Sequence, residues 1–344
     1  MKHEINLERY AVRTDLIVET IAQYKDKKGI HMNTKQFDQV RLDEVEIDEE
    51  GETYYNKKRG MYQTITFEDV TDHTNRDKVQ EVFSFALKDL LSKHQIKEED
   101  TCLIIGLGNG KSTPDALGPK VIQSILVTKH LFDLPGSNVS SGYRNVAAFA
   151  PGVTGTTGIE TKDFILGITE KIKPQFLIVI DALAASSIDR VNKTIQMTDT
   201  GVHPGSGIGN SRTEISQDTI GIPVFAIGIP TVVDAVTIVS DTIFYMLKHF
   251  SYNKENIKNY KTKLIPIMNR NYLDHEENLS DKDKMKLMGL LGNLSEEELK
   301  TLVFEVLTPI GYNLMVTPKE IDFLLDQLSH VVAKGINETL HRQI

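Results

Sequence analysis

Blocks of apolar positions alternate with helix-like segments through the middle of the chain. Continuous apolar runs at Cys102–Gly106 and Phe176–Ile180 each pass into a glycine-rich or acidic turn, and two further runs end at Ala150 and Gly228. A run of this length bounded by turn residues is typical of a buried parallel strand. The alternation predicts an α/β fold, a three-layer α/β/α arrangement with a mainly parallel sheet and helices on both faces. Helical spacing occurs at residues 117–126, 159–172 and 232–247.

The segments before this core, which covers about residues 100–250, have weaker patterns. Residues 40–47 and 62–66 alternate apolar with polar positions, as half-exposed strands do. Residues 76–93 have the apolar spacing of an amphipathic helix. We therefore expect smaller N-terminal strands and a long helix before the main sheet.

The segment that follows the core changes in composition. Residues 251–283 are rich in Lys, Asn, Asp and Glu, which predicts a surface insertion or linker. Closing helices are expected at 287–307 and 317–340, the second starting with Thr317 as its N-cap. Residues 16–344 are expected to form a single α/β domain.

Composition and charge narrow the class of protein. The chain has 344 residues, 40% hydrophobic and 25% charged, as a globular protein does, and its net charge of −9 argues against direct nucleic-acid binding. It has no apolar stretch of the roughly 20 residues that span a membrane, and the N-terminus lacks the apolar segment of a secretory signal. The single cysteine, Cys102, fits a reducing cytoplasm and a buried core position.

A glycine-rich loop, Gly106–Thr113, comes close to two nucleotide-binding motifs. The P-loop pattern fails at Ile105 and the dinucleotide pattern fails at Lys111, where each requires glycine. The simpler interpretation is a tight turn from strand to helix. Thr113 and Pro114 then begin the helix, which places Asp115 in its first turn.

Asp115 and Asp181 occupy matching places in the sequence. Each is followed by Ala-Leu and each comes after one of the apolar runs. The carboxyl ends of parallel strands are where α/β proteins place their chemistry. Two carboxylates at neighbouring strand ends can share a proton or a water molecule, as a general acid and a general base do. The alternative for Asp115 alone is a residue that simply starts a helix.

Three further residues are candidates for lining such a site. Asn109 lies in the glycine-rich loop, His203 in the glycine-dense loop 202–210, and Asp234 after a Gly-Ile-Pro-Thr turn. A plain surface turn explains His203 equally well, and a helix start explains Asp234. The Gly-x-Ser-x-Gly and His-Glu-x-x-His signatures do not occur, which argues against a serine hydrolase and an ordinary zinc protease.

These segments resemble one known family. The loop Gly106–Pro119, the Ile180–Arg190 segment and the long Gly221–Asp241 stretch are similar to the germination proteases, spore endopeptidases that degrade small acid-soluble spore proteins. More distantly, the core resembles the hydrogenase-maturation endopeptidases, whose two acids and a His bind a metal. The resemblance implies that Asp115 and Asp181 are the catalytic pair and act without a cofactor or metal.

The same resemblance implies a zymogen that cleaves itself between Asp15 and Leu16, so that residues 1–15 are a propeptide and 16–344 the catalytic domain. The family's cleavage pattern is an acidic residue, a large apolar one, and another acid further on. Here Glu19 supplies the second acid, while Ile17 departs from the usual Ala. The family also implies a homotetramer in the cytoplasm of the developing spore, the forespore and spore core. Basic candidates for binding the acidic residues of a substrate are Lys111, Lys120, Arg144, Arg190 and Arg212.

Two alternatives stay open at this point. In one, Asp115, Asp181 and His203 hold a divalent metal that activates water, since carboxylates and imidazole suit such an ion. In the other, the chain is a non-catalytic α/β module that binds a nucleotide through the Gly106–Thr113 loop.

Overall fold

The structure, a computed structural model, describes residues 14–22, 24, 26–135, 139, 142–204, 213–256, 279–307 and 314–342. The chain divides into two compact units. One includes Val233–Val316, and the other runs from Arg13 to Val232 and resumes at Thr317. Each unit is described by itself below. The greater part of the expected propeptide and most of the expected insertion at 251–283 lie outside the described residues.

A single mixed sheet forms the centre of the larger unit. Its strand order is β1-β2-β3-β7-β8-β6-β4-β5, with the short β9 paired to the end of β8. The strands are β1 (Ile30–Phe37), β2 (Val40–Ile47), β3 (Gly60–Thr66), β4 (Cys102–Gly106), β5 (Val146–Phe149), β6 (Phe176–Ala185), β7 (Thr194–Thr198), β8 (Val224–Asp234) and β9 (Met315–Val316).

The predicted parallel core is confirmed at one side of this sheet. Strand β4 pairs in parallel with β5 and β6, and every residue of β4 is buried. The register with β6 runs from Cys102 opposite Phe176 to Gly106 opposite Ile180. Cys102 is fully buried, as expected, and burial raises the pKa of its thiol.

The other side of the sheet is antiparallel and differs from the sequence-based expectation. Strands β1, β2, β3, β7 and β8 pair in antiparallel order, so the expected small N-terminal strands extend the main sheet. Strand β1 was not expected from the sequence, and its residues are mostly exposed. Pairing, and not burial, determines this strand.

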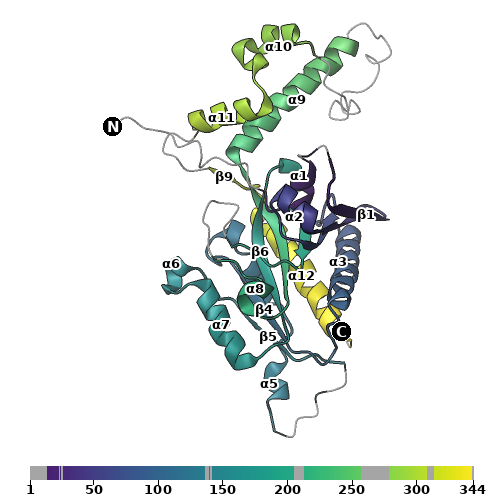
Figure 1. Cartoon of the computed structure of the whole chain (residues 1–344), viewed down its shortest axis with the longest axis vertical. Coiled ribbons are helices and arrows are strands. Elements are labelled where there is room, and N and C mark those ends of the chain that lie inside the picture. The colour runs from purple at the N-terminus through teal and green to yellow at the C-terminus, as the bar shows by residue number, and fades with distance from the viewer. Residues whose placement is uncertain are drawn as a thin grey trace. The chain divides into compact units, whose positions relative to one another are not determined.

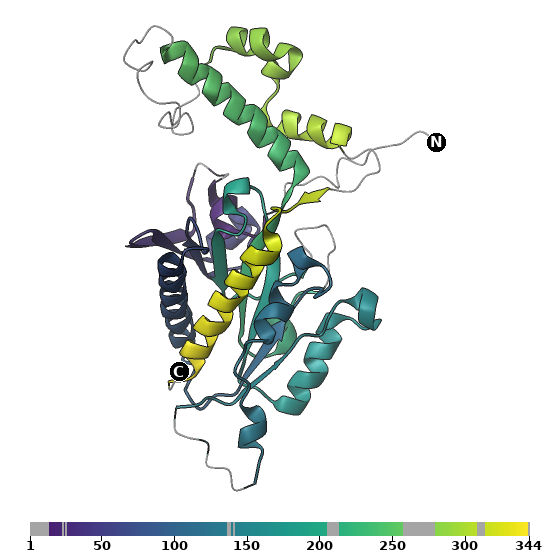
Figure 2. The ribbon, with the colours of Figure 1, turned by 180° about the vertical axis from the view of Figure 1, so that it is seen from behind.

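Helices cover both faces of the sheet in the larger unit, as predicted. Figures 1 and 2 show α12 behind the strands in one view and in front of them in the other. It packs with α3 and α4 on a core that includes Ile104, Ile178 and Ile195. The opposite face packs against α7, through Ile165. The helices of this unit are α1 (Ile17–Ala22), α2 (Glu49–Tyr55), α3 (His73–Lys93), α4 (Leu117–Ile122), α5 (Lys129–Phe132), α6 (Thr154–Thr157), α7 (Thr161–Ile172), α8 (Gln217–Ile220) and α12 (Ile321–Leu340), with 3₁₀ turns η2 (Thr113–Asp115) and η3 (Ile188–Arg190).

The smaller unit is mainly helical. It contains α9 (Ala235–Asn256), α10 (Asp281–Met288), the 3₁₀ turn η7 (Gly289–Asn293) and α11 (Glu296–Leu307). Helix α11 packs on α9 through Val303 and Phe304, which lie against Val236. The single closing helix expected at 287–307 is therefore split by η7. Among the helices that the structure describes, none is long and apolar enough to cross a membrane.

The expected start of the last helix is wrong by three residues. Helix α12 begins at Ile321, and Thr317 does not cap it. The Thr317 hydroxyl donates instead to the backbone carbonyl of Thr231, at 2.9 Å. Thr317 thus bonds the residues before α12 to strand β8 and does not cap the helix. The sequence pattern does not predict this, because the bond joins residues far apart in the chain.

One buried histidine gives this fold a pH dependence. The side chain of His341 is 1% exposed, and its Nδ1 accepts a hydrogen bond from the backbone N–H of Arg144 at 3.2 Å. Burial lowers the pKa of this imidazole below its ordinary value of 6.5, and the charge of Arg144 acts in the same direction. As the pH falls, the unfolded chain takes up this proton first. The stabilisation is therefore complete above the ordinary pKa and is lost as the pH falls through the lowered one.

We predict that His341→Gln reduces the loss of stability on acidification. Between about pH 7.5 and about pH 5, the free energy of unfolding of the parent chain should fall more than that of the variant, which has no imidazole to protonate. Urea unfolding at both pH values measures the difference. Equal losses in the two proteins would contradict the assignment to His341.

Candidate active site

The first candidate acid, Asp115, is held by the loop that follows β4. It ends the 3₁₀ turn η2, and its Oδ2 accepts a hydrogen bond from the backbone N–H of Asn109 at 2.8 Å. The loop can fold back this closely because Gly108 has a φ of +108° and lies against the Asp115 backbone. From β8, the hydroxyl of Thr231 donates to the carbonyl of Pro114 at 2.6 Å. The position of Asp115 is thus fixed from two strands.

The second candidate acid, Asp181, lies on β6. It is 7% exposed, and its Oδ1 accepts from the backbone N–H of Ala182 at 2.9 Å. The sequence placed Asp181 just past a strand end, but β6 continues to Ala185. The difference arises because β6 is longer than β4, and the pairing of the two strands ends one residue before Asp181.

The register of β4 and β6 brings Asp115 and Asp181 toward the same end of these two strands. Gly106 lies opposite Ile180, and the backbone N–H of Leu107 donates to the carbonyl of Ile180 at 2.8 Å. Asp181 follows Ile180 directly, and the turn that carries Asp115 packs against β6. Neighbouring carboxylates at such a strand edge can divide the roles of proton acceptor and proton donor.

The other expected site residues have separate places. Asn109 belongs to the loop that binds Asp115, and its side-chain Oδ1 accepts from the backbone N–H of Lys111 at 3.0 Å. Asp234 is the last residue of β8 and belongs to the smaller unit; its Oδ1 accepts from the backbone N–H of Val236 at 2.7 Å. Burial raises the pKa of Asp234, and that hydrogen bond opposes the shift.

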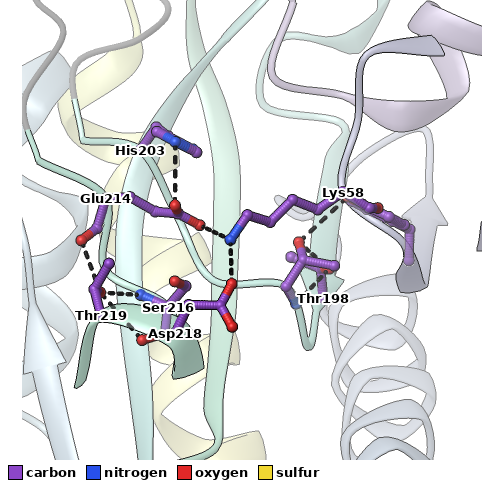
Figure 3. A network of polar contacts seen from close by, with 9 residues as sticks. Lys58, Thr198, His203, Glu214, Ser216, Asp218 and Thr219 are labelled. Carbon is purple, nitrogen blue, oxygen red and sulfur yellow. Dashed lines mark hydrogen bonds and ion pairs between the residues drawn. The ribbon is translucent and has the colours of Figure 1, made fainter. Parts of the chain in front are cut away.

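His203 belongs to a polar network between β3 and α8 (Figure 3). Its Nε2 lies 3.7 Å from Oε2 of Glu214, and the other oxygen of Glu214 lies 2.5 Å from Nζ of Lys58. Lys58 also contacts Asp218, at 2.8 Å. Burial lowers the pKa of Lys58, but the bonds to Asp218 and Glu214 outweigh this effect and raise it overall. Most of the loop after His203 lies outside the described residues.

Within the part of the chain that the structure describes, no three His, Cys, Asp or Glu side chains gather as a metal-binding group. The nearest partner shown for the His203 ring is the carboxylate of Glu214.

The expected cleavage segment is held by hydrogen bonds and by burial of its apolar side chains. Asp15 is bound to β6, where its backbone N–H donates to the carbonyl of Ala184 at 3.3 Å and its Oδ2 accepts from the Ala184 N–H at 3.0 Å. Leu16 is fully buried, and Ile17 is 1% exposed. The residues that hold this segment include Gln196 and Lys57, which sequence reasoning missed. Their role depends on strand pairing, and neither residue has a local motif.

The basic residues proposed from the sequence have other partners. Arg144 donates to the backbone carbonyls of Lys97 and Asp100, and its guanidinium lies over the ring of Phe176. A second candidate, Arg190, donates to the hydroxyl of Thr66 on β3. Lys120 pairs with Asp326, Lys111 is exposed, and Arg212 lies outside the described residues. Arg144, Arg190 and Lys120 thus contact residues outside the cleavage segment.

Comparison with known proteins gives a consistent result over the whole length. A model of the germination protease family matches residues 10–344. A germination protease from Geobacillus sp. is 45% identical over 362 residues, which cover 100% of this chain and 97% of the relative. One from Oceanobacillus iheyensis is 47% identical over 352 residues, 97% of this chain and 95% of the relative. Among solved structures, a NiFe-hydrogenase maturation protease from Thermococcus kodakarensis aligns with 42% of this chain and 80% of its own, at 17% identity and a TM-score of 0.26.

The fold and the relatives first define the class: an α/β protein with one candidate acid in the turn after β4 and the other on the neighbouring parallel strand β6, whose full-length relatives are proteases. The chain belongs to the germination protease family. It is therefore a peptidase, a hydrolase of peptide bonds. The resemblance to the germination proteases that the sequence indicated is therefore confirmed.

The contact between Gly108 and Asp115 yields a testable prediction. In Gly108→Ala, the new Cβ would lie 2.0 Å from the Asp115 carbonyl oxygen, and the positive φ is unfavourable for alanine. We expect a loss of about 2 kcal/mol or more in the free energy of unfolding, because the loop must move. Denaturant unfolding measures it.

The matched control is Gly110→Ala in the same loop. There the nearest atom to a new Cβ is the Cβ of Pro119, at 3.5 Å, which is an ordinary contact. This variant should be nearly as stable as the parent. Similar losses in both variants would show that the loop tolerates no substitution for a more general reason.

Proposed function

We propose that this chain is an endopeptidase that begins the degradation of small acid-soluble spore proteins during spore germination. It is made as a zymogen, in which residues 1–15 are a propeptide removed by self-cleavage between Asp15 and Leu16. Residues 16–344 then form the catalytic domain. The enzyme works as a homotetramer in the spore core, without direct contact to nucleic acid or membrane. Membership of the germination protease family supports these assignments.

The proposed catalytic groups are Asp115 and Asp181. One observation supports this part of the proposal: the pairing that sets Gly106 opposite Ile180 is accompanied by packing of the turn that carries Asp115 against β6, the strand that carries Asp181. Carboxyl groups that lie close together do not both ionise readily, so one stays protonated while the other is charged.

Hydrolysis then needs one water molecule and both acids. The ionised carboxylate takes a proton from water as the oxygen attacks the carbonyl carbon of Asp15 in self-cleavage. The protonated carboxyl group donates its proton to the departing nitrogen of Leu16. The products are a new carboxyl group on Asp15 and a new amino group on Leu16. The two aspartates end with their protonation states exchanged. Transfer of one proton from one aspartate to the other restores the starting state.

A target within the chain further supports the proposal. The sequence Asp15-Leu16 with Glu19 follows the acidic–apolar–acidic pattern, and Asp15 is hydrogen-bonded to β6, the strand that carries Asp181.

We predict that Asp115→Asn and Asp181→Asn, made separately, each lose self-processing. Amide side chains cannot exchange the protons that water attack requires, so the rate should fall by a factor of about 100 or more. The measurement is N-terminal sequencing and intact mass after incubation at mildly acidic pH, where the parent should gain a terminus at Leu16. A short peptide containing residues 13–20 serves as a substrate in trans.

The control is Asp133→Asn, which removes an exposed aspartate that pairs with Lys129. This variant should be processed at the parental rate. Parental processing by either Asp115→Asn or Asp181→Asn would refute the paired mechanism. Dialysis against a chelator should leave the rate unchanged, and a loss that added metal restores would assign water activation to a metal.

A further inference from the structure

The segment Thr14–Glu19, called here the junction segment, lies in the larger unit and is held along its length. Its contacts come from β6, from Gln196 on β7 and from Lys57, which precedes β3. Leu16 and Ile17 are buried, and Glu19 is 8% exposed. A segment that contains the proposed cleavage bond is thus bound by the fold in the manner of a peptide ligand.

Gln196 contacts both sides of the Asp15–Leu16 bond. Its Nε2 donates to the backbone carbonyl of Asp15 at 2.8 Å, and its Oε1 accepts from the backbone N–H of Ile17 at 2.7 Å. The side chain is 7% exposed, so both bonds are formed away from water. A carboxamide is suited to this arrangement, because it offers one donor and one acceptor in a plane to a peptide backbone of any sequence.

Two backbone N–H groups, one near the end of β6 and one just beyond it, bind the carboxylates of Asp15 and Glu19 in the junction segment. The Ala184 N–H donates to the carboxylate of Asp15 at 3.0 Å, and the Ser186 N–H donates to Oε2 of Glu19 at 2.8 Å. The spacing of two residues along β6 matches two acids that lie four apart in a segment that turns into α1. These contacts favour an acceptor at each position over an apolar side chain, and a carboxylate over an amide because a charge-assisted hydrogen bond is stronger.

Lys57 supplies the positive charge. Its Nζ donates to the backbone carbonyl of Thr14 at 3.2 Å. Burial lowers the pKa of Lys57, and the charges of Asp15 and Glu19 oppose that shift. The second oxygen of Glu19, Oε1, is buried and has no hydrogen-bond partner among the described residues. A buried carboxylate of this kind needs a positively charged neighbour, and Lys57 is one.

The binding surface and Asp181 share one face of the sheet but not one position. Ile180, Ile195 and Met197 point into the core under α3 and α12, so Asp181 and Gln196 point to the opposite face. Ala184 lies three residues beyond Asp181, about 10 Å along an extended strand. The contacts that hold the junction segment therefore lie away from Asp181, and the Asp15–Leu16 bond has to move along β6 toward Asp181 before the catalytic aspartates can act on it.

We propose that Gln196 and Lys57, with the N–H groups of Ala184 and Ser186, form the site that selects acidic–apolar peptide segments for this enzyme. In the uncleaved chain the junction segment occupies it. After residues 1–15 depart, Leu16 to Glu19 stay in the protein, so a segment of a protein substrate can take only the places of Thr14 and Asp15, at Lys57, the Ala184 N–H and the donor of Gln196. The identity of the occupant rests on the proposed function, whereas binding of the junction segment is testable without catalysis.

The first test measures binding in a chain that cannot cut itself. In the full-length Asp115→Asn protein, hydrogen exchange at the Ile17 amide reports the bond to Gln196. Adding Gln196→Met should speed this exchange by about tenfold or more, because a thioether side chain neither donates nor accepts as the carboxamide does. Gln63→Met is the matched control, since Gln63 is also buried, lies opposite Met197 on β3, and bonds to Asp89.

The second test measures selection during cleavage. In the processed chain with both aspartates intact, Gln196→Met should raise KM for the peptide of residues 13–20 by about tenfold and change kcat little, as loss of the donor to the Asp15 carbonyl does. Gln196→Glu keeps the acceptor for the Ile17 N–H but loses the donor to Asp15, and it should also raise KM. Thermal unfolding of each variant checks that the fold is intact.

The third test uses charge. Lys57→Met should slow processing, whereas Lys58→Met should not, because Lys58 pairs with Glu214 and Asp218. Lys57→Glu should be slower still, and Glu19→Lys in the same chain should restore part of the rate. Recovery by the reversed pair is not expected if Lys57 only supports the fold.

The outcomes separate this inference from the proposed function. Inactive dyad variants, together with parental exchange and parental KM in the Gln196 and Lys57 variants, would refute the selection site and leave the catalytic proposal standing. Altered exchange at Ile17 with an active Asp115→Asn protein would support the binding of the segment and refute the paired aspartates.

Discussion

The pairing of β4 with β6 is the constraint on which the rest of the site depends. It sets Gly106 opposite Ile180 and is closed by the bond from the Leu107 N–H to the Ile180 carbonyl. A slip of one residue would turn Asp181 into the core under α12, since side chains alternate between the two faces of a strand. The loop that carries Asp115 would lose its place against β6 at the same time. Both strands are buried along the paired stretch, and this burial makes the register costly to change.

The unequal length of these two strands is equally important. Because β6 continues past the end of β4, one strand both carries Asp181 and bonds to Asp15 through Ala184. The antiparallel side of the sheet then adds Gln196, which lies opposite Gly228. A side chain at Gly228 would collide with Leu183 of β6, within 2.4 Å, so the close approach of these strands requires glycine there. The mixed character of the sheet thus brings a side chain of β7 to the segment that β6 binds.

The sequence predicted those parts of the fold that depend on local burial. Runs such as Cys102–Gly106 are apolar because both faces of the strand are covered, and a periodic pattern is enough to detect this. It did not predict β1, whose exposed residues are determined by pairing with β2, or the continuation of β6 past an aspartate. Asp115 and Asp181 were found because their strands were. Gln196 and Lys57 were not, since each meets the junction segment through contacts between residues far apart in the chain.

Ile17 shows how one residue serves both the junction segment and the fold. The resemblance to the germination proteases implies alanine as the usual residue at this place in a substrate, yet here the larger side chain is 1% exposed and packs with Ile21, Val45 and Ile47. A substrate needs only to fit the binding surface, but Ile17 would stay in the protein after the proposed cut between Asp15 and Leu16. Truncating a buried isoleucine to alanine costs about 2–5 kcal/mol. The departure from the substrate pattern therefore follows from the core that Ile17 helps to form under β2, and the contacts that position the bond are made by its backbone N–H, which every residue except proline has.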